Sequence, residues 1–388
     1  MRISENVTLK GFKKIKLNKK IKNYLKKIIH EENHIIGSCY PSYKNSYNKK
    51  TILKLKRYNK LNLIGMGGSI LGARSIYSFL NHKIKKNFCF FDNLNIKKNN
   101  TQNKNKNLNL IISKSGNTLE TITNMNILIK KNQKNIFITQ NKESYLTTLA
   151  KKMRAEIIHH NDYIGGRYSV LSEVGMLPAE LMGLNQKKFR CLNNLINNKN
   201  FVNSLISNVS NTLEFIRNKK FNSIILNYDE NSNDLFYWYQ QLLAESLGKK
   251  GKGLMPIISN MPKDNHSLMQ LYLDGKKNNF FTFFFTNEKS SKKILNNNLF
   301  NSHHYLKNKK VEDILKAQFI STQNVFKKKK IPFRSFYINK KDEQSLGVLF
   351  TFFILETILL AKVMDVNPYD QPAVELIKKE TKKILVNS

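Results

Sequence analysis

The stretch LNLIISKSGNTLET at residues 108–121 decides the fold class, because an apolar run there ends in a cluster of hydroxyl side chains. The run 108–112 predicts a buried parallel strand, and Ser113, Ser115 and Thr118 fall on the turn and first helical turn after it. A helix start has unpaired backbone N–H groups and the positive end of the helix dipole, so hydroxyls placed there suit a phosphate. Ser and Thr are also ordinary helix caps, so capping alone is a second interpretation.

A second strand that runs into a glycine turn precedes this stretch, in KLNLIGMGGSILGA at residues 60–73. Gly68 belongs to this turn and Ser69 opens the next helix; without a Cβ, glycine lets the backbone approach a ligand closely. Asp92 closes the following strand, but the glycine spacing is not the dinucleotide fingerprint GxGxxG, so NAD is not favoured. Two such units fit one small phosphorylated ligand, bound across neighbouring strand ends of an open α/β sheet.

The charge of the chain is strongly positive, with 66 Lys and Arg against 27 Asp and Glu in 388 residues, a formal net charge of +39. Such a balance is typical of proteins that bind nucleic acid or an anionic surface. Most of the excess is lysine mixed with asparagine in segments such as 93–107, and we attribute it to compositional drift. The sequence has no basic stripe interleaved with aromatics, no zinc spacing and no helix-turn-helix signature, so no specific nucleic-acid partner is expected.

Cysteines and apolar segments give no sign of secretion or membrane insertion. Cys39, Cys89 and Cys191 form neither a disulfide framework nor a metal motif. Residues 1–20 are basic but lack the apolar core of a signal peptide. The most apolar segment, 347–364, carries two charges and is shorter than the roughly 20 residues of a membrane span. We therefore expect a soluble, cytoplasmic protein with no membrane partner, in which this segment is a buried helix.

Strand and helix patterns alternate along the chain, which predicts parallel, doubly wound sheets. A first unit has expected strands at 61–65, 87–91, 108–112, 135–139 and 156–159. A second unit has expected strands at 221–228, 280–286 and 333–338, with long helices at 234–247 and 344–364. The predicted organisation is an N-terminal extension of uncertain structure (1–50), a first α/β lobe (51–200) and a second lobe with a C-terminal helix (201–388).

Two further motifs carry residues suited to a site. In DYIGGRYSVLS, from residue 162, paired glycines fix a sharp turn and present Arg167, an arginine placed to grip an oxyanion or a phosphate. In NPYDQPAVELIKKETKKIL, from residue 367, two prolines punctuate a loop before a terminal helix.

These motifs, taken together and in this order, resemble the phosphoglucose isomerases of the bacterial type over roughly residues 60–385. QQLLAESLGKKGKG and DNHSLMQLY add the segments that resemble those carrying the family's base and ring-opening histidine. The resemblance implies two sugar-isomerase (SIS-type) lobes and a homodimer whose active sites are completed across the subunit interface. It also implies interconversion of glucose 6-phosphate and fructose 6-phosphate through a cis-enediol(ate), in glycolysis and gluconeogenesis, without a cofactor or metal. Ala373 stands where the family usually has glycine, and the first 50 residues match nothing in it.

Aldose–ketose isomerisation must open the sugar ring, move a proton between C1 and C2 and stabilise an enediolate. A partly buried carboxylate suits the proton transfer and an imidazole suits the ring opening. The resemblance assigns the base to Glu245, ring opening to His266 with help from Lys378, and stabilisation of the enediolate to Arg167. The substrate-binding residues that it implies are Gly68, Ser69, Ser113, Lys114, Ser115, Thr118 and Gln371. His159 and His160 are interpreted as structural.

Three other functions are compatible with parts of this pattern. A related sugar-phosphate isomerase, acting also on mannose 6-phosphate or on an amino sugar, would use the same lobes and differ in pocket shape. A non-catalytic sugar-phosphate sensor would keep the hydroxyl loop but would not need Glu245, His266 and Lys378, all of which are present. A basic nucleic-acid-binding protein is the alternative from another class.

Overall fold

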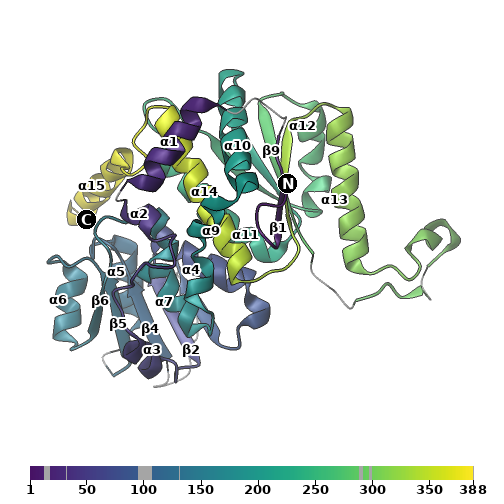
Figure 1. Cartoon of the computed structure of the whole chain (residues 1–388). Coiled ribbons are helices and arrows are strands. Elements are labelled where there is room, and N and C mark those ends of the chain that lie inside the picture. The colour runs from purple at the N-terminus through teal and green to yellow at the C-terminus, as the bar shows by residue number, and fades with distance from the viewer. Residues whose placement is uncertain are drawn as a thin grey trace.

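The computed structural model describes residues 1–12, 18–31, 33–94, 107–130, 132–287, 292–296 and 299–387. The chain folds into two α/β lobes, each built on a five-stranded sheet (Figure 1). The strands are β1 (Val7–Lys10), β2 (Lys60–Gly65), β3 (Asn87–Phe91), β4 (Asn107–Ile112), β5 (Lys134–Thr139), β6 (Glu156–His159), β7 (Asn222–Asn227), β8 (Met255–Asn260), β9 (Asn279–Thr286) and β10 (Phe333–Ile338). This confirms the predicted α/β class with mainly parallel sheets.

Helices cover both sheets and connect the lobes. Those before or within the first lobe are α1 (Lys19–His30), α2 (His34–Gly37), α3 (Lys49–Leu55), α4 (Leu71–Phe79), α5 (Leu119–Leu128), α6 (Tyr145–Lys152) and α7 (Glu173–Leu181). The later ones are α8 (Gln186–Phe189), α9 (Leu192–Asn197), α10 (Lys199–Arg217), α11 (Asn233–Leu247), α12 (Met269–Asp274), α13 (Val311–Lys328), α14 (Glu343–Val363) and α15 (Pro372–Asn387). Short 3₁₀ helices that matter for the site are η1 (Gly67–Ser69), η3 (Gly166–Leu171) and η5 (Lys263–His266).

The first sheet has the strand order β3-β2-β4-β5-β6, and every pair in it is parallel. Successive residues of a strand point to opposite faces, so Leu110 packs toward the main core while Ile111 packs into a second cluster with residues of α5 and α6. Both faces are therefore apolar, which explains the continuous apolar runs in the sequence. The strand order reverses between β2 and β4, so the two predicted glycine and hydroxyl turns lie at a switch point.

The second sheet has the order β1-β10-β9-β7-β8, with β1 antiparallel to β10 and the other pairs parallel. One of its faces packs aromatic side chains of β9 against α13, and the other packs against the core shared with the first lobe. The helix α14 runs through that shared core, and 89% of its most apolar window is buried. It is long and apolar enough to cross a membrane by composition, yet its position in the core accounts for those side chains.

Two strands were missed by the sequence analysis. The strand β8 reads MPIISN, and a proline within an apolar run argues against a central strand; β8 lies at the edge of its sheet, where proline is tolerated. The other, β1, has four residues and was assigned to an N-terminal extension of uncertain structure. It pairs with β10, and α1 packs on α10 and α14, so this part of the N-terminal segment completes the second lobe. The boundaries at residues 50 and 200 stay a prediction.

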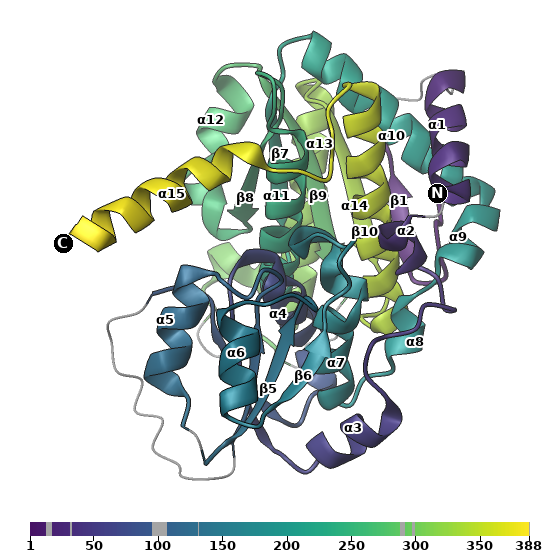
Figure 2. The same cartoon turned by 90° about the vertical axis from the view of Figure 1, so that its left-hand side faces the viewer.

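The lobes meet where α4 of the first packs against α11 of the second. Arg74 of α4 makes ion pairs with Asp92, at the end of β3, and with Asp234, at the start of α11. The terminal helix α15 leaves this body and projects away from it (Figure 2). The turns η1 and η3, which follow β2 and β6, both contact α11.

Candidate active site

Arg167 lies at the centre of the junction between the lobes. It follows β6 in η3, and its residue is 3% exposed. A Cβ added to Gly68 would lie 2.1 Å from the carbonyl carbon of Gly166, so the first glycine turn packs directly on the backbone of the Arg167 turn. The indole Nε1 of Trp238 donates to the carbonyl oxygen of Arg167 at 3.1 Å. The backbone of this turn is thus fixed from both lobes.

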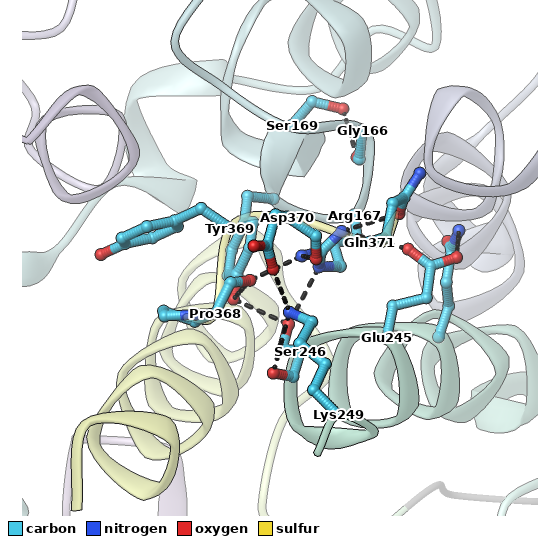
Figure 3. Close-up of polar contacts among 12 residues, drawn as sticks. Gly166, Arg167, Ser169, Glu245, Ser246, Lys249, Pro368, Tyr369, Asp370 and Gln371 are labelled. Carbon is cyan, nitrogen blue, oxygen red and sulfur yellow. Dashed lines mark hydrogen bonds and ion pairs between the residues drawn. The ribbon is translucent and has the colours of Figure 1, made fainter. Parts of the chain in front are cut away.

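The guanidinium of Arg167 uses all five of its N–H donors (Figure 3). Nε donates to Ser246 Oγ at 2.9 Å, and Nη2 donates to the carbonyl oxygens of Pro368 (2.6 Å) and Asp370 (3.0 Å). Nη1 donates to the Glu245 carboxylate at 3.2 Å and to Gln371 Oε1 at 2.9 Å. Three donors therefore anchor the side chain, and the two on Nη1 face the predicted base Glu245 and the predicted substrate-binding residue Gln371.

Glu245 lies in the last turns of α11, and its side chain is 26% exposed. One carboxylate oxygen accepts from Arg167, and the other accepts from Gln241 Nε2, one helical turn back, at 2.9 Å. The Gln241 amide in turn lies against Gly67, where an added Cβ would be 2.7 Å from Nε2. The carboxylate is consequently oriented by two donors while it keeps an exposed side.

The loop at 367–371 is clamped to the end of α11 by Lys249. The Lys249 ammonium makes an ion pair with Asp370 at 3.0 Å and donates to the carbonyl oxygen of Asn367. Its hydrogen bond to Asp370 lowers the pKa of that carboxyl. Tyr168 also donates to the Pro368 carbonyl at 3.1 Å, and burial raises the pKa of this tyrosine to about 12. Gln371 is held beside Arg167 by these contacts.

The hydroxyl loop joins β4 to α5. Ser113 and Thr118 hydroxyls lie 2.8 Å apart, and Thr118, the N-cap residue of α5, makes no side-chain hydrogen bond to the helix start. Capping alone therefore does not explain Thr118. Gly116, with φ +68°, lies against Ser144 at the start of α6, and Ser115 is exposed at the tip of the loop. The loop leaves hydroxyls and helix-start N–H groups together at one point, which is what an anion requires.

Lys114 points away from that group, because its ammonium donates to the carbonyl oxygen of Asp162 at 2.7 Å. Burial lowers the pKa of Lys114. This contact links the hydroxyl loop to the start of the Arg167 turn. The parallel pairing of Gly65 with Ile112 brings the end of β2 beside the end of β4, so Ser69 and the hydroxyl loop emerge at the same sheet edge.

The family model for phosphoglucose isomerase matches residues 54–388. The chain belongs to the phosphoglucose isomerase family. Among relatives, a glucose-6-phosphate isomerase of Mycoplasmopsis pulmonis is 31% identical over 83% of this chain and 82% of its own length. One from Methanocaldococcus jannaschii is 29% identical over 96% and 94% of the two chains.

Solved structures show the same fold. A hypothetical protein from Thermus thermophilus superposes with a TM-score of 0.80 at 22% identity, covering 94% of each chain. A glucose-6-phosphate isomerase from Chlamydia trachomatis gives a TM-score of 0.69 at 18% identity, covering 91% of this chain and 78% of that one. The predicted resemblance and the SIS-type fold are thereby confirmed.

Two residues that the phosphoglucose isomerase resemblance assigned to catalysis make no hydrogen bond or ion pair with the other described site residues. His266 is exposed on η5 and makes no side-chain hydrogen bond, ion pair or ring contact with any residue that the structure describes. Lys378 is exposed on α15 and pairs with Glu375 of the same helix at 2.6 Å. By contrast, Arg167, Glu245 and Gln371 meet, Gly68 abuts the Arg167 turn, and Ser69 shares a sheet edge with the hydroxyl loop.

Several residues around this phosphoglucose isomerase site were missed by sequence reasoning. Gln241 could have been found from α-helical spacing, since it lies four residues before Glu245 on the same helix, whereas Ser246, the next residue after Glu245, had no such signal. Trp238 and Tyr168 had no local signal, because their partners are distant in sequence. Thr121, in the first turn of α5, has a buried hydroxyl without a partner among the described residues. Among the residues that the structure describes, no group of three or more His, Cys, Asp or Glu is suited to hold a metal ion.

Proposed function

We propose that this phosphoglucose isomerase interconverts glucose 6-phosphate and fructose 6-phosphate through an enediolate. The observation that carries the proposal is the contact of Arg167 and Glu245, a buried cation beside a partly exposed carboxylate at the carboxyl ends of the strands. The names of the relatives point to the same reaction. No oxidant enters, because the proton removed from C2 is returned to C1 and the hydroxyl proton of O2 passes to O1, so that C1 is reduced as C2 is oxidised.

Glu245 would take the C2 proton of the open-chain aldose and deliver it to C1. The carboxylate has an exposed side for the sugar, and its orientation is fixed by Gln241 and Arg167. As the proton leaves, negative charge grows on the sugar oxygens. The Nη1 donors of Arg167, which bond to Glu245 and Gln371 here, would donate to those sugar oxygens in place of one of these acceptors, whereas the Nε and Nη2 donors keep the guanidinium in place.

The 6-phosphate would bind at the hydroxyl loop, through Ser113, Ser115 and Thr118 and the N–H groups at the start of α5. The loop lies beside Ser69 at the switch point, so the phosphate and the sugar can occupy neighbouring strand ends. Lys114 would act on phosphate binding indirectly, by holding the loop in place through the contact of its ammonium with the Asp162 carbonyl.

Ring opening would be supplied by His266 of the partner subunit in a homodimer. Two observations support this assembly. His266 is exposed and unused within one chain, as described above. None of the sixteen residues of α15 is buried, and its apolar side chains Leu376, Ile377 and Val386 are 69–74% exposed. An isolated helix of this length is marginal in water, so a second chain packed on α15 would explain both the helix and its apolar side chains.

Substrate choice is tested by an assay of glucose, mannose and fructose 6-phosphates with metal chelated. We expect fructose 6-phosphate to form from glucose 6-phosphate and not from mannose 6-phosphate. Formation from both would favour the broader isomerase, and turnover of neither would overturn the proposal. Binding to duplex DNA as a function of salt tests the other class, because many phosphate contacts give a steep slope.

Shared active sites are tested by mixing subunits. His266→Ala subunits supply an intact Glu245, and Glu245→Gln subunits supply an intact His266. Heterodimers should regain part of the wild-type activity, since one of their two sites is complete. Heterodimers that form but stay inactive would show that each site is built from one chain.

We further propose that the protein is soluble and is located in the cytoplasm, where its sugar-phosphate substrates are found.

A further inference from the structure

We propose that Asn33 and His34 are positioning residues for Arg167, acting from the segment that precedes the family-matched residues 54–388. The inference rests on the catalytic role proposed above for Arg167. Asn33 and His34 lie at the start of α2, and each contacts one of two chain segments that place Arg167: Asn33 the loop at 367–371, which accepts from the guanidinium, and His34 the turn that leads into Arg167.

Asn33 holds the segment that supplies the carbonyl acceptors of Arg167. Its Nδ2 donates to the hydroxyl of Tyr369 at 2.9 Å. Tyr369 stands between Pro368 and Asp370, whose carbonyl oxygens accept both Nη2 bonds of Arg167. A shift of Tyr369 would therefore move both acceptors at once.

The Asn33 amide is itself fixed in orientation. Its Oδ1 accepts from the backbone N of Ile35 at 2.9 Å as the N-cap of α2, which turns Nδ2 toward Tyr369. Ile35 and Ile36 are buried in the core, so α2 is a firm support for this contact. One side chain thus connects the core to the loop at 367–371.

His34 holds the other segment, the turn that leads into Arg167. Its imidazole stacks on the ring of Tyr163 with centroids 4.5 Å apart and an interplanar angle of 16°. Asn161 Nδ2 lies 3.4 Å from the His34 Nδ1. Tyr163 is 73% exposed, so this stack buries little surface and serves mainly to place the turn.

The consequence for catalysis follows from the use of all five donors by Arg167. If the acceptors of Nη2 shift, the planar guanidinium rotates, and Nη1 moves relative to Glu245 and Gln371. A small misplacement of such a group slows the chemical step more than it weakens binding, because its main work is in the transition state. The contact of Asn33 with Tyr369 does not involve the phosphate loop, so breaking it should change KM little.

The experiment compares kcat and KM for fructose 6-phosphate in Tyr369→Phe, His34→Ala and His34→Phe. Tyr369→Phe removes only the hydroxyl that Asn33 contacts and leaves the cap of α2 intact. We expect its kcat to fall about 2- to 10-fold, as for one hydrogen bond, with KM within about 2-fold. His34→Ala should lower kcat, and His34→Phe, which keeps a stacking ring, should restore it.

A matched control is Tyr228→Phe, which removes a tyrosine hydroxyl bonded to Thr322 at 3.0 Å, packed against α13 in the second lobe. It should lower stability without lowering kcat. An equal loss of kcat in Tyr228→Phe and Tyr369→Phe would mean a general structural effect and would overturn the inference.

The same substitutions in an Arg167→Lys background decide whether they act through Arg167. If they do, Tyr369→Phe should lower kcat little further in that background, since the planar guanidinium that Tyr369 helps to position is absent. If Tyr369→Phe lowers kcat by the same factor in the Arg167→Lys background as in the wild-type protein, the inference is overturned. If Tyr369→Phe keeps the wild-type kcat while Arg167→Lys is slow, the inference about positioning is overturned but the proposed role of Arg167 is not. Wild-type kcat in Arg167→Lys overturns the role of Arg167, and the inference with it.

Discussion

The Nη1 atom of Arg167 lies 3.2 Å from a carboxylate oxygen of Glu245, and the two residues come from different lobes. Arg167 follows β6 of the first sheet, whereas Glu245 lies in the last turn of α11, the helix that follows β7 of the second sheet. The site therefore depends on the way the lobes pack. Within the first lobe, the Arg167 turn packs directly on the first glycine turn, where Gly68 meets Gly166.

Gly68→Ala should disrupt this contact. The new Cβ would lie 2.1–2.4 Å from backbone atoms of Gly166 and Arg167, which cannot rotate away. Overpacking of this kind costs about 1–3 kcal/mol of stability, and the displaced turn should lower kcat. Thermal unfolding and steady-state kinetics measure both effects.

Gly165→Ala is the control, since the nearest atom to its added Cβ is a ring carbon of Tyr168 at 3.8 Å. It should keep most of the activity and stability. Equal losses in the two variants would contradict the account, because only Gly68 lacks the space.

The fold was largely predictable from sequence because its strands are buried on both faces. Runs such as LNLII are apolar whichever face a residue points to, and the strand positions of the first lobe were predicted to within one residue. The two edge strands of the second sheet were not predicted, because neither has a continuous apolar run. The strand β8 contains a proline and β1 has four residues, so local pattern carried little signal for either.

The site was predictable only in part. Motifs placed Arg167, Glu245 and the hydroxyl loop, but sequence spacing could not show that Arg167 makes hydrogen bonds to residues 78 to 204 positions away. Nor could it show that Gln371 meets Arg167 while Lys378, seven residues on, points into solvent. These relationships arise from tertiary packing.

Substitution of Ser115 and Thr118 by alanine should weaken substrate binding more than it slows chemistry. Phosphate contacts are made equally in the ground and transition states, so KM should rise about 10-fold or more while kcat stays within a few-fold. Steady-state kinetics with fructose 6-phosphate provide the check. A fall in kcat with unchanged KM would contradict a phosphate role for this loop.

The buried His160 should make stability depend on pH. Burial lowers its pKa from 6.5 to about 4, so between these values the unfolded chain holds more protons than the folded one. Stability should therefore fall by up to roughly 3 kcal/mol as the pH drops from 6.5 to 4. Glu173, whose pKa burial raises, acts with the opposite sign.

His160→Gln isolates this contribution, since Glu173 is present in both proteins. The stability lost by the substitution should shrink as the pH falls below 6.5 and stay constant above about pH 7.5. Urea unfolding at several pH values measures it. A difference that does not vary with pH would contradict the assignment.

Proton exchange at C1 of fructose 6-phosphate in D₂O, catalysed by the Glu245→Gln variant, tests the central claim most directly. The amide keeps the shape of the carboxylate but cannot accept a proton, so isomerisation should fall by about 10²- to 10⁴-fold. His266 and Lys378 are untouched, so the variant should still bind the substrate and interconvert its anomers. The account predicts that C1 exchange falls together with isomerisation; exchange at close to the wild-type rate would show that Glu245 is not the base.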